Sequence, residues 1–286
     1  MGLRLVSQHG CFGGSQRFYA HDSSECRTEM RFSVYLPPQV AAGPVAVLYY
    51  LAGLTCTEET FMVKAGAQRL AARLGLMLVA PDTSPRRVRF PGDDASWDFG
   101  LAAGFYVDAV QPPWSANYRM YSYVTEELPR IVAAEFPADP ARQGIFGHSM
   151  GGHGALVCAL RNPGQYRCVS AFAPIVAPSQ VPWGQKAFTG YLGTDRAAWR
   201  DYDASALAAR SRFPHPILID QGSDDRFLAE QLRPEAFAAA CRESGTELQL
   251  RTQPGYDHGY YFIASFVDDH LRHHARALTA PRGQLQ

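Results

Sequence analysis

Short apolar runs alternate with stretches of helical period along most of the chain. The apolar runs lie at residues 45–51, 76–80, 144–146, 168–172, 217–219 and 248–250. Helical spacing predicts helices at residues 61–74, 122–136, 150–162, 228–243 and 261–278. Strands that are apolar on both faces and separated by helices are typical of a parallel sheet covered on both sides. We therefore expect an α/β fold with a mostly parallel central sheet and helices on both faces.

The first forty residues follow a different pattern. Short β-rich pieces, such as residues 31–36, alternate with Gly and Pro turns, which predicts an antiparallel entry to the sheet. The segments 85–114 and 174–203 are rich in Gly, Pro and aromatic residues, and each follows a predicted strand end. Ligands bind at that edge of an open α/β sheet. A single domain over residues 1–286 fits this length, because no linker or internal repeat divides the chain.

Composition argues against several classes of function. The 27 Lys and Arg residues balance the 27 Asp and Glu residues, so no strong field would draw the protein onto nucleic acid or an anionic membrane. The six cysteines lack metal-ligand spacing, and we expect reduced thiols and no metal site. No stretch resembles a signal-peptide core or approaches the roughly 18 apolar residues of a membrane span. We expect a cytoplasmic protein that acts on a small molecule.

A G-x-S-x-G motif at residues 147–151 supplies the candidate nucleophile, Ser149. Small residues on either side of the serine let the chain bend sharply and present its hydroxyl. The predicted strand that enters this turn and the predicted helix that leaves it are the context that the motif requires. The pattern indicates a serine hydrolase.

Backbone amides are the expected donors to the oxyanion that forms when a serine attacks an acyl group. The amide after the nucleophile belongs to Met150, and the loop after an early strand offers the amide of Leu54. Gly53 permits the close backbone turn at that point. Thr55 and Glu58 are expected to form a capping box for the next helix.

A serine hydroxyl needs a base to take its proton. In α/β-hydrolases the three residues come in the chain order Ser, then Asp or Glu, then the His that acts as the base. His258 is the candidate, because it lies in a loop after a predicted strand and before the last helix. The remaining histidines after the motif are assigned other positions. We expect His270, His273 and His274 to be solvated or to face the C-terminal dipole of the last helix, His215 to lie at the opposite sheet edge, and His153 to belong to the helix after the serine.

Several carboxylates compete to orient that histidine. We prefer Asp225, which completes a Gly-x-x-Asp turn that can return its side chain over the sheet edge, with Asp224 as the second choice. Asp220 lies within the strand pattern. Asp257 is adjacent to His258, and neighbouring side chains in an extended loop usually diverge.

Several longer motifs go beyond a generic hydrolase. They are LTCTE at 54–58, SWDFG at 96–100, NYRMYSYVTEE at 117–127, GHSMGGHG at 147–154, DQG at 220–222 and YDH at 256–258. With these motifs the sequence resembles the S-formylglutathione hydrolases, also called esterase D, from residue 7 to the His-His pair near the C-terminus. The resemblance implies the α/β-hydrolase fold and a triad of Ser149, Asp225 and His258. It also implies hydrolysis of S-formylglutathione in formaldehyde detoxification, activity on short-chain aryl esters and, commonly, a homodimer.

The chemistry requires no metal or organic cofactor, because a thiolate leaves easily and a serine with its base completes the reaction. Glutathione carries two carboxylates and one ammonium, so the cationic loop 86–89, with Arg87 at its centre, is a candidate attractor for its conjugate. Other candidate residues of the substrate pocket are Cys56, Trp97, Phe99 and Trp183.

Three other interpretations are compatible with parts of the pattern. A short-chain carboxylesterase would share every catalytic residue, and the ratio of kcat/KM for S-formylglutathione to that for an aryl acetate separates the two. A non-catalytic α/β-hydrolase scaffold would fail to react with a fluorophosphonate at Ser149. An acyltransferase that uses a sugar or lipid acceptor would be expected to carry a signal peptide.

Overall fold

The computed structural model describes residues 2–279, in which nine strands form one mixed sheet of order β1-β2-β3-β5-β4-β6-β7-β8-β9. The strands are β1 (Arg4–Cys11), β2 (Gly14–Asp22), β3 (Glu29–Leu36), β4 (Val45–Leu51), β5 (Leu76–Pro81), β6 (Ala138–His148), β7 (Val169–Phe172), β8 (Ile217–Gly222) and β9 (Leu248–Gln253). Strands β4 to β9 run parallel, whereas β1, β2 and β3 are antiparallel and join the sheet through β3 and β5. This confirms the predicted parallel sheet with an antiparallel entry.

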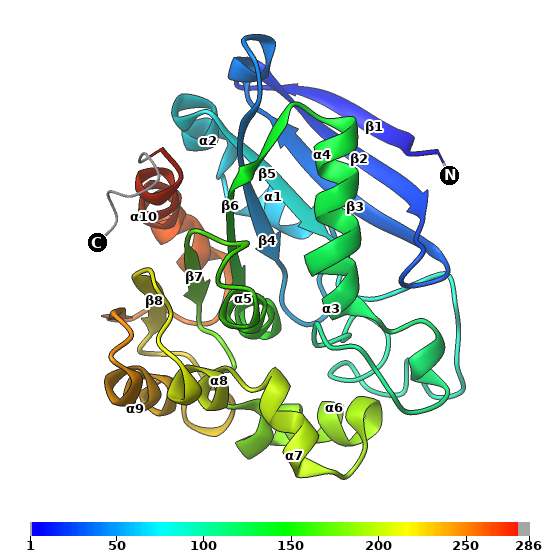
Figure 1. The fold of residues 1–286 in the computed structure, drawn as a ribbon, viewed down its shortest axis with the longest axis vertical. Coiled ribbons are helices and arrows are strands. Elements are labelled where there is room, and N and C mark those ends of the chain that lie inside the picture. The colour runs from blue at the N-terminus through cyan, green and yellow to red at the C-terminus, as the bar shows by residue number, and fades with distance from the viewer. Residues whose placement is uncertain (1, 280–286) are drawn as a thin grey trace.

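Helices cover both faces of the sheet. They are α1 (Thr60–Lys64), α2 (Gln68–Leu74), α3 (Met120–Ser122), α4 (Leu128–Glu135), α5 (Met150–Arg161), α6 (Pro182–Leu192), α7 (Arg196–Trp199), α8 (Ala204–Arg210), α9 (Pro234–Ser244) and α10 (Tyr260–Thr279). Helix α10 contacts α2 and four of the central strands, while α4 and α5 pack on β6 from the other side (Figure 1). Among these helices of residues 2–279, none is long and apolar enough to cross a membrane.

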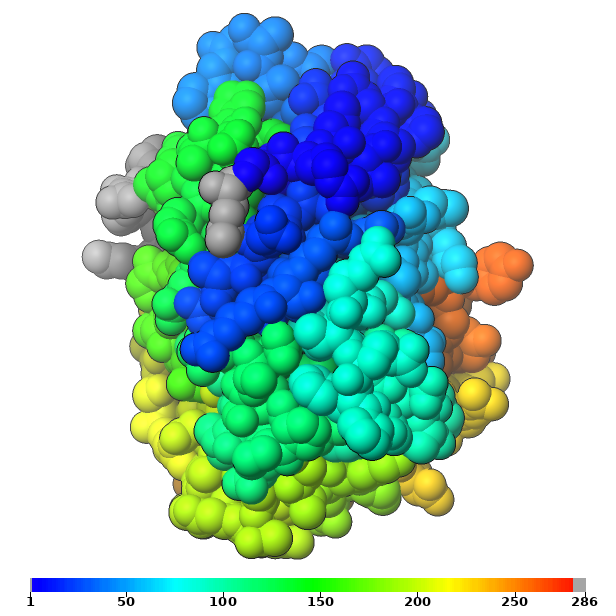
Figure 2. All heavy atoms as spheres, turned by 90° about the vertical axis from the view of Figure 1, so that its right-hand side faces the viewer, coloured from blue at the N-terminus to red at the C-terminus, as the bar shows by residue number. Residues whose placement is uncertain are grey.

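The burial of each strand follows its place in the sheet. All seven residues of the central strand β4 are buried, whereas most residues of the edge strand β1 are exposed. A central strand between two helical layers must be apolar on both faces, and an edge strand need not be. Figure 2 shows the side of the molecule where the N-terminal strands, in blue, lie against the cyan segment that follows β5.

Two predicted helices are interrupted. The expected helix at 61–74 divides into α1 and α2, with Gly66 at φ 71° between them. The expected helix at 228–243 is a π-helical turn followed by α9, and Arg233 at φ 50° separates them. Pro234 has no amide hydrogen and restricts the residue before it, which explains the second break. Helices α6, α7 and α8 were not anticipated, because glycines and prolines obscure the helical period in that region.

The histidines of the last helix differ most from the sequence-based expectation. His270 and His274 are fully buried, and both bond to the Ser170 hydroxyl at 2.8 Å. The His270 Nε2 atom lies 3.1 Å from Asp220, and the His274 Nδ1 atom lies 2.9 Å from the Cys168 sulfur.

The expectation of solvated histidines is therefore wrong for His270 and His274. Burial lowers the pKa of both imidazoles, and it lowers the pKa of the half-buried His273 to about 4. Burial alone would raise the pKa of Asp220, but hydrogen bonds from His270 and Arg251 lower it to about 2. His270 and His274 are therefore neutral, and their hydrogen bonds attach α10 to the sheet. Both are structural groups of the core.

The register of the parallel strands brings distant loops to one edge. Leu51 pairs with Gly147, His148 with Phe172, and Gly222 with Gln253. The loops that follow β4, β6, β8 and β9 therefore begin at nearly the same level. His215 lies just before β8, at the opposite edge as expected.

Candidate active site

Ser149 occupies the sharp turn between β6 and α5, with φ 57° and ψ −120°. A non-glycine residue at positive φ is strained and persists only where its surroundings hold it. A Cβ atom on Gly147 would collide with the backbone of Gly151 and Leu51, and one on Gly151 would collide with the backbone at the end of β4. The glycines of the motif thus allow β4 and α5 to approach the turn that presents the serine.

His258 and Asp225 meet from the loops after β9 and β8. The His258 Nδ1 atom donates to Asp225 Oδ2 at 2.5 Å, and the Asp225 carboxylate is fully buried. Asp225 also accepts the Phe227 amide at 2.9 Å and the Gln221 side-chain amide at 3.2 Å. A histidine held in this way presents Nε2 as a proton acceptor, which is the arrangement that activates a hydroxyl nucleophile.

The competing acids lie elsewhere. The Asp224 side chain is exposed and bonds to Ser223 Oγ, and Asp257 caps the amide of Gly259. Asp220 lies inside β8 and pairs with Arg251. Only Asp225 among these four carboxylates contacts His258 in the described structure.

A cavity of about 300 Å³ lies over Ser149 and His258. Its lining residues are Gly53, Leu54, Thr55, Cys56, Trp97, His148, Ser149, Trp183, Arg226, Phe227 and His258. Trp97 and Trp183 meet edge to face with ring centroids 5.2 Å apart, and Phe227 packs against both Trp183 and His258. The cavity thus combines a nucleophile and a base with a mainly aromatic wall, which suits a small acyl group.

His148 is a further ring of this cavity that sequence reasoning missed. Its ring centroid lies 4.4 Å from that of His258, and neither of its buried nitrogens has a hydrogen-bond partner among the described residues. Burial, together with the charge of a protonated His258, lowers the pKa of His148 well below its ordinary value. His148 therefore adds a neutral wall and no positive charge.

The backbone of the loop after β4 lies directly against the serine. A Cβ atom on Gly53 would come within 3.2 Å of the Ser149 Cβ atom, so a side chain there would crowd the turn. The amides of Leu54 and Met150 make no backbone hydrogen bond in the described loops and turns. Two free amides beside a nucleophile can bind an oxyanion.

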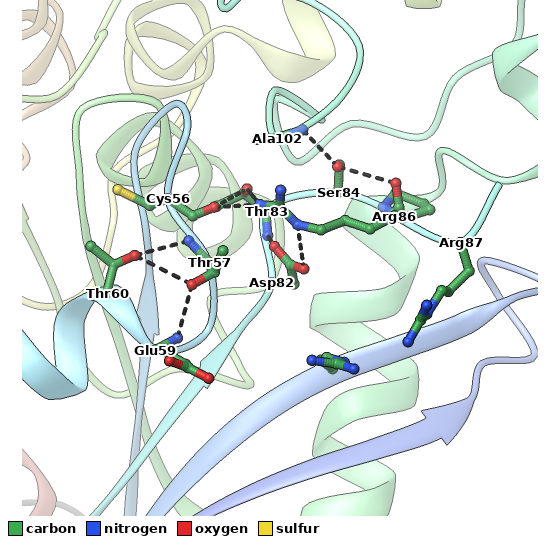
Figure 3. A network of polar contacts seen from close by, with 12 residues as sticks. Cys56, Thr57, Glu59, Thr60, Asp82, Thr83, Ser84, Arg86, Arg87 and Ala102 are labelled. Carbon is green, nitrogen blue, oxygen red and sulfur yellow. Dashed lines mark hydrogen bonds and ion pairs between the residues drawn. The ribbon is translucent and has the colours of Figure 1, made fainter. Parts of the chain in front are cut away.

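Arg86 and Thr83 fix this loop from the other side (Figure 3). The Cys56 carbonyl accepts the Thr83 hydroxyl at 2.6 Å and the Arg86 Nη2 atom at 2.8 Å. Arg86 is held in turn by Asp82, with Nε 2.6 Å from Oδ2. The turn that carries Leu54 is thereby tied to the end of β5.

The expected capping box of Thr55 and Glu58 is not formed. Thr55 has φ 68°, and α1 begins only at Thr60. Burial and the nearby Asp82 raise the pKa of Glu58 to about 7. The sequence has the spacing of a capping box, but residues 55–58 belong to a loop that ends before α1 begins at Thr60.

Two expected pocket residues do not line the cavity. The Phe99 ring stacks on Tyr191 at 4.7 Å and packs edge to face on Trp114, within an aromatic cluster beside the site. Arg87 instead lines a separate hollow of about 440 Å³ with Glu58 and Asp82. Cys56, Trp97 and Trp183 lie in the cavity wall.

All three arginines of the cationic loop 86–89 are ion-paired. The pairs are Arg86 with Asp82, Arg87 with Glu29, and Arg89 with both Asp93 and Asp94. Each of the three thus has a carboxylate partner, which the sequence pattern did not reveal, although Arg87 shares Glu29 with Arg4 and Arg31. In the described structure, Arg226 is the arginine that faces the cavity of Ser149.

Comparison with known proteins gives consistent matches. The Esterase family model, described as "Putative esterase", matches residues 23–273. The chain is 57% identical over 282 residues to S-formylglutathione hydrolase of Mus musculus, which covers 98% of this chain and all of the mouse protein. The corresponding protein of Bos taurus is 55% identical over 284 residues, with coverage of 98% and 100%. A solved S-formylglutathione hydrolase from Agrobacterium tumefaciens superposes with a TM-score of 0.92 at 50% identity, covering 96% of this chain and 99% of that one.

Proposed function

This chain belongs to the esterase family, and on that premise we propose that it hydrolyses S-formylglutathione to formate and glutathione with Ser149 as nucleophile. The substrate follows from relatives that match over nearly the full length of this chain. The chemistry follows from the site. The observation that carries it is the 2.5 Å contact between His258 Nδ1 and Asp225 Oδ2 beside the strained Ser149 turn.

The first half of the reaction forms a formyl-serine ester. His258 Nε2 takes the Ser149 proton as Oγ attacks the thioester carbonyl, and the amides of Leu54 and Met150 stabilise the oxyanion. Asp225 holds the His258 ring and stabilises the imidazolium that forms. The carbon–sulfur bond then breaks. Glutathione leaves as the thiol with the proton from His258, or as a thiolate while His258 loses that proton to solvent, and in both cases the ring returns to its neutral form.

The second half regenerates the enzyme. His258 accepts a proton from water, the resulting hydroxide attacks the formyl ester, and formate leaves as the proton returns to Ser149 Oγ. A thiol has a pKa near about 8.5, far below that of an alcohol, so expulsion of the thiolate needs little help from a general acid. Attack and oxyanion stabilisation should therefore dominate the barrier for the thioester.

Steady-state hydrolysis of S-formylglutathione beside p-nitrophenyl acetate tests this proposal. We expect a much higher kcat/KM for the thioester and loss of both activities in Ser149→Ala. Comparable or faster ester hydrolysis, still abolished by the substitution, would leave the triad in place and make the protein a general short-chain esterase. Undiminished activity in Ser149→Ala would overturn the mechanism.

The same proposal extends to the cell. We propose a role in formaldehyde detoxification in the cytoplasm, where glutathione is maintained in reduced form. Loss of the gene should raise sensitivity to formaldehyde, and cell fractionation tests the location. The family resemblance also favours a homodimer, which light scattering coupled to gel filtration tests directly.

A further inference from the structure

The substrate of the proposed function is an anion, whereas the lining of the cavity over Ser149 includes no lysine and a single arginine. Its walls are backbone, aromatic rings, a thiol and the two histidines His148 and His258. The ion-paired arginines of loop 86–89 do not reach it. Charge recognition of the glutathionyl group therefore needs another cation in the wall.

Arg226 is placed to supply that charge. It lies directly after Asp225 in the loop that follows β8, and its side chain is exposed at the edge of the cavity. Within residues 2–279, no carboxylate comes within ion-pair distance of its guanidinium. Asp225 bonds instead to His258, Gln221 and the Phe227 amide. The guanidinium therefore forms no ion pair in the described structure, and it belongs to the wall of the cavity that holds Ser149 and His258.

The guanidinium is also held in position. Its carbon lies 4.6 Å from the centroid of the Phe227 ring, within the range of a cation–π contact. The same ring packs edge to face on His258, with centroids 5.1 Å apart, and contacts Trp183 on another side. Arg226, Phe227 and His258 thus form one continuous piece of wall. Stacking on a ring leaves the N–H groups of an arginine free for a ligand.

We infer that Arg226 is a specificity-determining residue that binds a carboxylate of the glutathionyl group while Ser149 attacks the formyl carbon. The inference rests on the proposed function, because it assigns a residue to the leaving group of that reaction. An arginine presents paired donors that match the two oxygens of a carboxylate. A neutral aryl ester offers no such group and gains nothing from this contact.

The ratio of kcat/KM for S-formylglutathione to kcat/KM for p-nitrophenyl acetate measures this preference. Arg226→Gln should lower the ratio about five- to tenfold, mainly through KM for the thioester, because an exposed charge pair contributes modestly in water. Arg226→Lys should recover part of the loss. Arg87→Gln is the matched control, since it removes an arginine that lies outside the cavity, and it should keep the wild-type ratio.

A binding assay separates this inference from the proposed reaction. S-Methylglutathione should inhibit p-nitrophenyl acetate hydrolysis competitively, with an inhibition constant about five- to tenfold weaker in Arg226→Gln. The diethyl ester of S-methylglutathione lacks both carboxylates and keeps its ammonium, so its inhibition constant should not weaken in Arg226→Gln.

The outcomes are distinguishable. An unchanged activity ratio and inhibition constant in Arg226→Gln, with rapid thioester turnover by the wild type, would overturn the role of Arg226 alone. An equal loss in Arg87→Gln would also overturn it, because the effect would then be one of general charge. Absence of both thioester turnover and inhibition by S-methylglutathione in the wild type would overturn the inference together with the proposed function.

Discussion

Replacing Asp225 by Asn tests the proposed triad with little change in shape. The carboxylate accepts three hydrogen bonds, from His258 Nδ1, Gln221 Nε2 and the Phe227 amide. An asparagine has one acceptor oxygen where the aspartate has two. Its amide nitrogen must therefore face either His258 or the Phe227 amide.

Both orientations impair the base. An amide nitrogen facing His258 requires Nδ1 to be an acceptor, so the neutral ring carries its proton on Nε2 and cannot take the proton of Ser149. The opposite orientation places two donors face to face at Phe227. Either way the imidazolium loses its counter-charge. We expect kcat/KM to fall about 10³- to 10⁴-fold, or about 4–5.5 kcal/mol in the barrier.

The assay is hydrolysis of p-nitrophenyl acetate by Asp225→Asn beside the matched variant Asp224→Asn. Asp224 is the adjacent, exposed carboxylate, whose side chain contacts Ser223 Oγ, so its substitution should change kcat/KM less than about threefold. Thermal unfolding of both variants checks that the fold is retained. An Asp225→Asn enzyme within tenfold of the wild type, or a larger loss in Asp224→Asn, would refute the assignment of the acid.

Three further predictions concern stability and the cavity wall. Gly151→Ala should destabilise the fold by about 3 kcal/mol in urea titration, because its Cβ would collide with the Leu51 carbonyl, whereas Gly164→Ala, with open space around it, should be near neutral. Burial lowers the pKa of His153 to about 4, so the unfolded chain binds a proton below about pH 6.5 that the folded protein refuses. The contribution of His153 to the free energy of unfolding is therefore fully present above about pH 6.5 and is lost between about pH 6.5 and 4. At pH 5 this histidine alone lowers the free energy of unfolding by about 2 kcal/mol. Equal urea midpoints at pH 7.5 and pH 5 would contradict this prediction. Burial raises the pKa of the Cys56 thiol, and Cys56 lies in the wall of the cavity over Ser149. A bulky maleimide on this thiol should crowd the cavity and inactivate the enzyme, and the rate of inactivation should rise with pH as the thiolate forms. Retained sensitivity in Cys56→Ser would show that inactivation does not act through this position.

The local sequence pattern was sufficient to locate the strands, the helix and the loops that carry the candidate active site. The apolar run at 45–51 coincides with β4, and the predicted helix after Ser149 coincides with α5 to within one residue. These features depend on neighbouring residues: a strand buried on both faces is continuously apolar, and a sharp turn at a serine needs glycines beside it. The loops that carry Asp225 and His258 could be located because each directly follows a strand.

Only the tertiary structure decided which charges and histidines are free. Arg87 and Arg226 are both arginines in loops after strands, yet Arg87 pairs with Glu29, which lies far away in the sequence, and Arg226 faces the cavity. His270 and His274 occupy a helix whose sequence pattern suggested solvent, but they are buried against Ser170. Hydrophobic period describes which face of a segment is buried on average. The partners of a polar side chain depend on the register and packing of segments distant in sequence, and the chain fixes these only when it folds.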